Sequence, residues 1–157
     1  MDLSIHDVDY IYWILGMPKT VACEIVKRDE TTLHNLITLT YDGCCASITG
    51  SWGMPAAFYG GGLEYYLEIV GDRGMLEYQG GAEVKLVTDC GTEGFLLKEE
   101  DGYLRELMYF VDCIRKDAEP DSCSVDSVEG TMNILWAAKR AAAQGRIVSL
   151  EEMDSRI

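Results

Sequence analysis

The chain has 157 residues and a formal net charge of −14, from 27 acidic and 13 basic side chains. A hydrophobic content of 48% indicates a folded chain with a sizeable core rather than a disordered one. So acidic a chain, with no basic stripe, excludes nucleic acid as a partner and disfavours anionic membrane surfaces. No run of 18 apolar residues is present, so we expect no membrane span.

The first residues of the chain have neither the basic region nor the long apolar region of a signal peptide. We therefore expect a cytoplasmic protein. Six cysteines without a C-x-x-C pair, together with only two histidines, predict neither disulfides nor a metal site. The cysteines are expected to be mostly buried, reduced thiols.

A helix is predicted first, because Ile5, Val8, Tyr12 and Leu15 recur at helical spacing. Gly16 ends it, and Pro18 prevents its continuation. Residues 20–88 then alternate apolar and polar side chains, as strands do, with a hairpin turn at Asp42-Gly43. We expect strands at about 21–26, 33–41, 44–52, 63–70, 75–78 and 83–88.

Two helices follow, over residues 103–116 and 125–144, and residues 147–150 could form a short last strand. The order of helix, strands and helices predicts an α+β fold with an open, mainly antiparallel sheet and helices packed on one of its faces. Residues 1–157 are expected to form a single domain.

The sheet face opposite the helices is predicted to carry small, weakly polar side chains: Thr38, Thr40, Ser47, Thr49 and Ser51. Such side chains permit the close approach of another sheet, which favours a homodimer or higher homo-oligomer. The alternative is an ordinary solvated face. His34, in the same region, is interpreted as a surface or interface histidine.

The strongest candidate site lies in the first helix. Asp2 and His6 are four residues apart and share one helix face, and Asp9 is three residues beyond His6. A carboxylate beside an imidazole orients the ring and suits it to general acid–base chemistry on a hydroxyl or carbonyl. An acidic first turn that only complements the helix dipole explains the spacing as well.

Aromatic residues gather in the middle of the chain, and Trp52 and Tyr59 could line a pocket for a sugar-like substrate. Packing in the core or at an interface explains the cluster as well. The full cluster is Trp52, Phe58, Tyr59, Tyr65 and Tyr66.

Several short motifs follow one another along the chain. The pattern D-x-x-x-H-x-x-D-x-x-x-W-x-x-G runs from Asp2 to Gly16. The later motifs are Ser51-Trp52 before Pro55, Glu68 to Leu76, Phe110 to Arg115, and Ala137 to Val148. In their order, and over nearly the whole chain, these motifs resemble the glucose–fructose oxidoreductase, inositol dehydrogenase and rhizopine-catabolism (Gfo/Idh/MocA) family.

This resemblance implies the C-terminal substrate and oligomerisation domain of an oxidoreductase that acts on a sugar, polyol or related substrate with NAD or NADP. No G-x-G-x-x-G occurs, so the family's N-terminal Rossmann domain is expected to be absent, no coenzyme is expected to bind this chain, and the chain alone should be catalytically incomplete.

The resemblance assigns Asp2 and His6 to acid–base chemistry. Asp9 is interpreted as a hydrogen-bond acceptor beside the helix, and Trp13 as a core residue. The alternative function is a non-catalytic dimerisation or interaction module that stands alone.

Overall fold

The computed structural model describes residues 4–55, 57–58, 64–98, 101–122 and 124–154. The chain divides into two compact units, one made of residues 1–54 and 119–157 and the other of residues 55–118. The elements confirm the predicted α+β fold with antiparallel sheets and helices. That the whole chain forms one domain stays a prediction.

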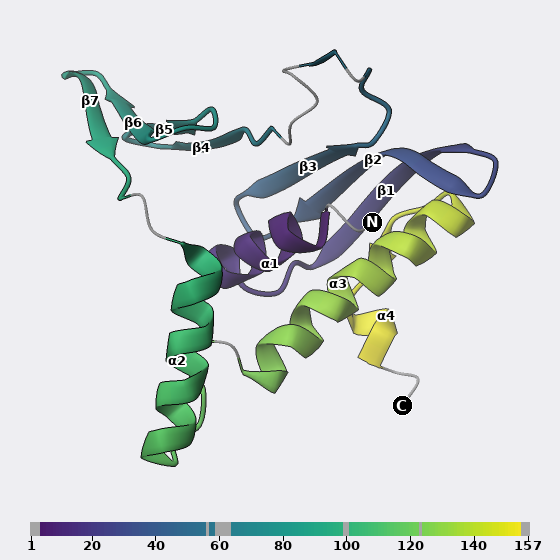
Figure 1. Ribbon diagram of the computed structural model, residues 1–157. Coiled ribbons are helices and arrows are strands. Elements are labelled where there is room, and N and C mark those ends of the chain that lie inside the picture. The colour runs from purple at the N-terminus through teal and green to yellow at the C-terminus, as the bar shows by residue number, and fades with distance from the viewer. Residues whose placement is uncertain (1–3, 56, 59–63, 99–100, 123, 155–157) are drawn as a thin grey trace. The chain divides into compact units, whose positions relative to one another are not determined.

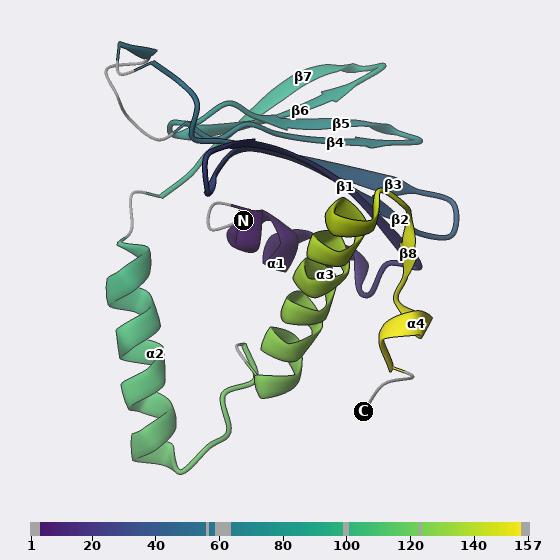
Figure 2. The ribbon, with the colours of Figure 1, turned by 90° about the vertical axis from the view of Figure 1, so that its right-hand side faces the viewer.

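The first unit is built on a four-stranded antiparallel sheet. Its strands are β1 (Thr20–Arg28), β2 (Thr31–Thr40), β3 (Cys45–Ser51) and β8 (Val148–Ser149), in the order β3-β2-β1-β8 (Figure 1 for β1 to β3, Figure 2 for β8). The predicted turn at Asp42-Gly43 joins β2 to β3, and Gly43 has a φ of 80° that favours glycine. Ile37 pairs with Cys23 on one side and with Ile48 on the other.

Two helices, α1 (Ser4–Leu15) and α3 (Val125–Gln144), lie on one face of this sheet (Figures 1 and 2). The predicted stop at Gly16 is confirmed, because its amide donates to the Tyr12 carbonyl at 2.8 Å with a φ of 74°. Ser124 caps the start of α3 by accepting from the Ser127 amide, and Gly145 ends it. A short helix, α4 (Glu151–Asp154), follows β8.

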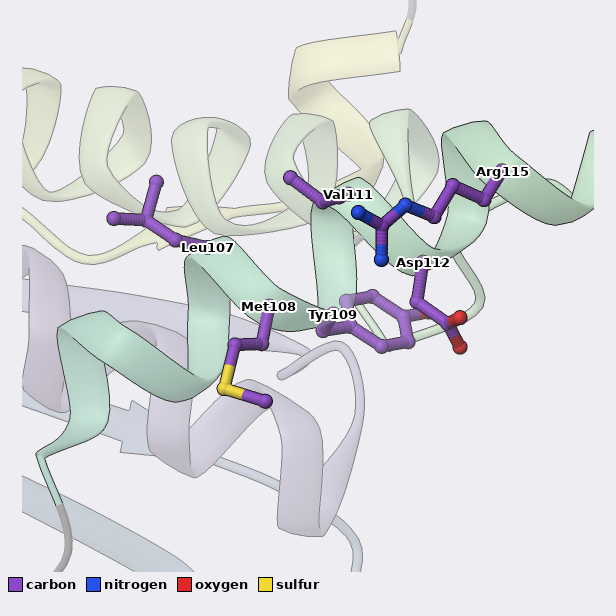
Figure 3. A pocket seen from close by; sticks show the side chains of 6 residues that line it. All are labelled: Leu107, Met108, Tyr109, Val111, Asp112 and Arg115. Carbon is purple, nitrogen blue, oxygen red and sulfur yellow. The ribbon is translucent and has the colours of Figure 1, made fainter.

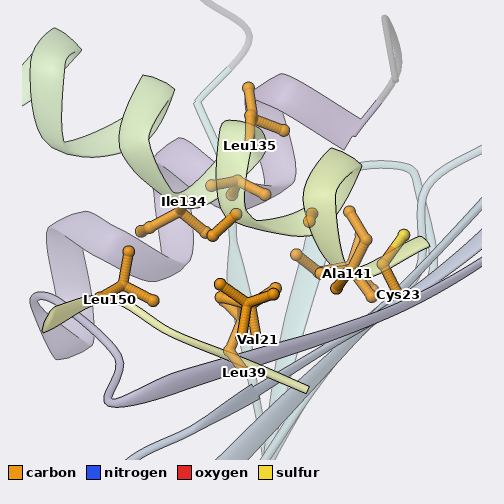
Figure 4. Packing of buried hydrophobic residues seen from close by; sticks show 13 residues of the cluster. Val21, Cys23, Leu39, Ile134, Leu135, Ala141 and Leu150 are labelled. Atoms are coloured by element: carbon orange, nitrogen blue, oxygen red, sulfur yellow. The ribbon is translucent and has the colours of Figure 1, made fainter. Parts of the chain in front are cut away.

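The core of this unit lies between the sheet and the helices (Figure 4). Ile37, Leu39 and Val21 are fully buried from the sheet, and Ile134 is fully buried from α3. Each such side chain contributes roughly 1.5–3 kcal/mol by leaving water. Three buried alanines on α3 allow the helix backbone to approach the strands closely: Ala137, Ala138 and Ala141.

Contacts between α1 and α3 depend on a glycine and a hydroxyl. The backbone of Gly130 lies so close to the Tyr12 ring that a Cβ at this position would overlap it. One residue on, the Thr131 hydroxyl donates to Asp9 Oδ1 at 2.6 Å. The predicted role of Asp9 as a hydrogen-bond acceptor is therefore confirmed.

The second unit holds a four-stranded antiparallel meander and one helix. Its elements are β4 (Leu67–Gly71), β5 (Gly74–Tyr78), β6 (Glu83–Thr88), β7 (Gly91–Leu96) and α2 (Gly102–Lys116). Strand pairing places Leu67, Tyr78, Val84 and Phe95 in one row on one face of the sheet. The predicted apolar stripe of α2 forms, yet none of its residues is buried.

Three details differ from the sequence-based expectations. The strands form two sheets rather than one, and β7 was not predicted because its two glycines and a glutamate resemble a loop. Trp13 is 77% exposed rather than in the core. It lies five residues after the buried Val8, which turns its side chain to the far side of α1.

The expectation of mostly buried cysteines is also wrong. Cys23 is buried, and this burial raises the pKa of its thiol to about 11. Cys44, Cys45 and Cys90 are exposed because they lie at or beside turns between strands.

Replacing Gly130 with alanine tests the packing of α1 on α3. Alanine favours a free helix by about 1 kcal/mol over glycine, but here the added methyl group would displace Tyr12. We expect Gly130→Ala to lower the free energy of unfolding by about 1–3 kcal/mol, measured by urea denaturation. The loss should shrink in a Tyr12→Leu background, and a gain of stability in the single variant would contradict this packing.

Candidate functional site

His6 lies in the first turn and a half of α1, on the side of the helix that faces solvent. Ser4 and Val8, two residues to either side, are fully buried, whereas His6 is exposed. Two residues turn a helix by about 200°, so a side chain between two buried neighbours is directed outward. The structure thus places the predicted acid–base histidine where a ligand can reach it.

The other predicted site residues are only partly described. Asp2 and Tyr59 lie outside the described residues. Trp52 directly follows β3, its side chain is 57% exposed, and its amide donates to the Leu33 carbonyl at 2.8 Å. A Cβ on Gly50 would lie 2.8 Å from the Ser4 hydroxyl, so the start of α1 and the end of β3 meet. His6 and Trp52 therefore come from neighbouring chain segments.

Asp7 is a half-buried carboxyl that the sequence analysis did not single out. Burial raises the pKa of Asp7 above its usual value, and the neighbouring His6 opposes this by lowering it. Asp7 is thus a second ionisable side chain in the first turn of α1, next to the exposed His6. The sequence signal that could have indicated the half-buried position of Asp7 is its neighbour Val8, which belongs to the apolar side of the predicted helix.

The hollow formed by α2 does not contain the predicted site residues. It has a volume of about 540 Å³ and is lined by residues of this one helix. Figure 3 shows that apolar side chains line most of it, with one carboxylate and one guanidinium near the end of the helix. The lining residues are Leu107, Met108, Tyr109, Val111, Asp112 and Arg115.

Within the described ranges, no group of three or more histidine, cysteine, aspartate or glutamate side chains is placed to hold a metal ion. No helix in the part of the chain that the structure describes is both long and apolar enough to cross a membrane.

Known proteins resemble this chain in sequence. The family model of the GFO/IDH/MocA C-terminal domain matches residues 1–77. Myo-inositol 2-dehydrogenase of Thermotoga maritima is 26% identical over 170 residues, which cover 98% of this chain and 49% of that protein.

Solved structures show the same fold. An oxidoreductase from Agrobacterium radiobacter, in complex with NAD+, L-tartaric acid and magnesium, aligns over 97% of this chain and 49% of its own, with a TM-score of 0.77 and 19% identity. Aldose-aldose oxidoreductase from Caulobacter crescentus, complexed with glycerol, aligns over 93% of this chain and 45% of its own, with a TM-score of 0.77 and 16% identity.

These matches confirm the predicted resemblance to the Gfo/Idh/MocA oxidoreductases. The chain is similar to the GFO/IDH/MocA C-terminal domains in sequence and in fold. It spans about half the length of the relatives it matches.

The raised pKa of Asp7 predicts a pH-dependent effect of removing its charge. A carboxyl whose pKa is higher in the folded state stabilises the fold below its unfolded-state pKa of about 3.9, and this contribution is lost as pH rises through the folded-state pKa. We therefore expect Asp7→Asn to gain stability relative to the unchanged protein between about pH 3 and pH 7. Urea denaturation across this range measures it, and a relative loss with rising pH would show that Asp7 is not desolvated.

Proposed function

We propose that this chain is the substrate-side domain of an NAD- or NADP-dependent oxidoreductase that acts on a sugar, polyol or related hydroxyl or carbonyl substrate. The observation that carries the proposal is the exposed His6 on a helix whose opposite face is fixed in the core. Support comes from the relatives, which include a myo-inositol 2-dehydrogenase and an oxidoreductase solved with NAD+.

The described residues do not fit a dinucleotide site. Such a site needs free backbone amides at the start of a helix that follows a strand and a glycine-rich turn. After β7, the amides of Tyr103 and Leu104 at the start of α2 already bind the Asp101 carboxylate, whose charge would repel phosphate. After β8, α4 has only four residues. A separate coenzyme-binding domain, as long as the remaining half of the relatives, would have to supply the nicotinamide.

His6 is proposed as the group that exchanges a proton with the substrate oxygen. A nicotinamide coenzyme on the separate domain would accept the hydride that an alcohol carbon loses on oxidation. The O–H proton of the hydroxyl group on that carbon must leave as well, and a neutral imidazole at hydrogen-bond distance from the oxygen can accept it. In the reverse direction the imidazolium returns the proton to the carbonyl oxygen. Asp2 would orient the ring from one turn earlier, and Trp52 would contact the apolar face of the substrate.

Removing the imidazole tests this role. In a protein that joins this chain to its coenzyme-binding domain, His6→Ala should lower turnover by about 10²- to 10⁴-fold, the usual contribution of a general acid–base group. Coenzyme affinity should stay nearly the same because His6 belongs to the substrate side. Steady-state kinetics and coenzyme titration measure both quantities.

The control is His34→Gln, which removes the chain's other histidine from the sheet and should leave turnover near normal. Unchanged turnover in His6→Ala would instead show that the acidic first turn serves only as a helix cap. It would favour a non-catalytic interaction module.

We also propose that the chain forms a homodimer or higher homo-oligomer through the sheet face away from α1 and α3. Strand pairing places Thr38 beside Ser47, and Thr40 beside Cys45, on that face. Thr40, Ser47 and Thr49 are exposed, and small side chains let a second sheet approach to about 10 Å. A stable interface would bury more than roughly 1,000 Å² of accessible surface.

A charge placed on this face tests the association. In a two-fold dimer Thr49→Arg would put two guanidinium groups into one interface, so it should weaken association while leaving the fold intact. Sedimentation equilibrium at a concentration on the order of 10 µM measures the mass. Ala143→Arg, which adds the same charge to an exposed position of α3, should not weaken association. An unchanged mass in Thr49→Arg, or a monomeric parent protein, would contradict the proposed interface.

A further inference from the structure

A buried polar contact holds the first turn of α1 against the sheet. The Ser4 hydroxyl donates to Asn35 Oδ1 at 2.9 Å, and this pair connects α1 to β2 across 31 residues of sequence. Ser4 is fully buried and Asn35 is 4% exposed. Both lie on the side of the sheet whose other central positions are apolar, Ile37 and Leu39 among them.

Gly50 makes the room for this contact. It pairs with Asn35 in the register of β2 and β3. A Cβ at Gly50 would lie 2.8 Å from Ser4 Oγ and 3.0 Å from Asn35 Nδ2. These distances are shorter than van der Waals contact, so any larger residue would push the start of α1 away from the sheet. The helix reaches this depth only because the strand carries no side chain there.

The chemistry of the contact suits orientation better than stability. An apolar pair of the same shape could fill this space at little cost, whereas a hydrogen bond fixes direction as well as distance. Ser4 lies two residues before His6, about 200° around the helix. A bond that fixes the rotation of α1 at Ser4 therefore also fixes the direction in which the His6 side chain leaves the helix.

A second hydrogen bond acts on the same helix from another side. Asp9 accepts from Thr131 of α3 at 2.6 Å. One bond to the sheet and one to α3, five residues apart along α1, restrict both its rotation and its sliding along its axis. His6 lies between these two attachment points.

We propose that Ser4, Asn35 and Gly50 are positioning residues for His6, which set the rotation and depth of the α1 first turn from which its imidazole extends. The catalytic meaning of this arrangement rests on the proposed function of His6. The arrangement itself can be tested without turnover, because His6 is one of only two histidines in the chain.

The imidazole resonances of His6, observed by NMR in the 157-residue chain, are the direct readout. Ser4→Ala and Gly50→Ala should each shift them, because one removes the hydrogen bond and the other displaces the turn. In Ser4→Ala/Gly50→Ala the missing hydroxyl removes the 2.8 Å contact, the shortest that the new methyl group would make, so the resonances should return toward those of Ser4→Ala alone. Val148→Ala, which opens a cavity in the same core at β8, is the matched control and should leave them in place.

Two results would overturn the proposal. One is a folded Ser4→Ala variant whose His6 resonances do not move. The other is a Val148→Ala variant that moves them as far as Ser4→Ala does, since the effect would then be general loosening of the core. If Gly50→Ala does not fold, Ser4→Ala and the double variant still decide between these outcomes.

Kinetics separate this proposal from the proposed function. In the protein joined to its coenzyme-binding domain, Ser4→Ala should lower kcat by about 10- to 100-fold with a smaller change in KM, since a misplaced group acts mainly on the chemical step. If His6→Ala leaves turnover unchanged while Ser4→Ala still shifts the His6 resonances, the catalytic role fails and the positioning role stands. If His6→Ala abolishes turnover and Ser4→Ala changes neither kcat nor the resonances, the positioning role fails alone.

Discussion

The close approach of α1 to its neighbours at two glycines is the constraint on which the rest of this unit depends. At Gly130 the Tyr12 ring occupies the space of a missing side chain on α3, and at Gly50 the Ser4–Asn35 pair does the same on β3. Because neither neighbour presents a side chain at its contact, the helix sinks far enough to bury Val8 completely. The close approach of α1 at these two glycines therefore determines both the packing of the core and the position of the candidate site.

This packing divides α1 into two faces with different tasks. The inner face carries Ser4 and Val8 and is fixed by burial and hydrogen bonds. The outer face carries His6 and Trp13 and makes no contribution to the core. General acid–base chemistry requires a rigid element of this kind, because the reacting group must be held at a defined angle and distance. Asp7 lies between the two faces, and its side chain is half-buried.

Much of the fold could be predicted from local sequence signals. Helical spacing, the Gly16 stop and the Asp42-Gly43 turn are determined by residues close together in the chain, and each of them is confirmed. The contacts that fix α1 could not be predicted, because Ser4 meets Asn35 across 31 residues and Asp9 meets Thr131 across 122. Nothing near Asn35 in the sequence indicates that its amide is buried against a helix.

The site shows the same limit. The spacing of Asp2 and His6 predicted that they share one helix face; His6 is exposed, and Asp2 lies outside the described residues. Trp13 was misplaced because a large aromatic residue is more often buried than exposed, although its position on the helix turns it outward. The separation of β4–β7 from the first sheet depends on which strands pair, and alternation along single strands carries no information about partners.

Amide hydrogen exchange in the 157-residue chain tests most directly whether α1 is a fixed part of the core. The amides of Val8, Ile11 and Tyr12 should exchange as slowly as those of Ile37 and Leu39 in β2, because all of these hydrogen bonds should open only when the whole unit unfolds. Fast exchange throughout α1 beside a protected β2 would contradict it, since a helix that opens on its own cannot hold His6 in a defined position.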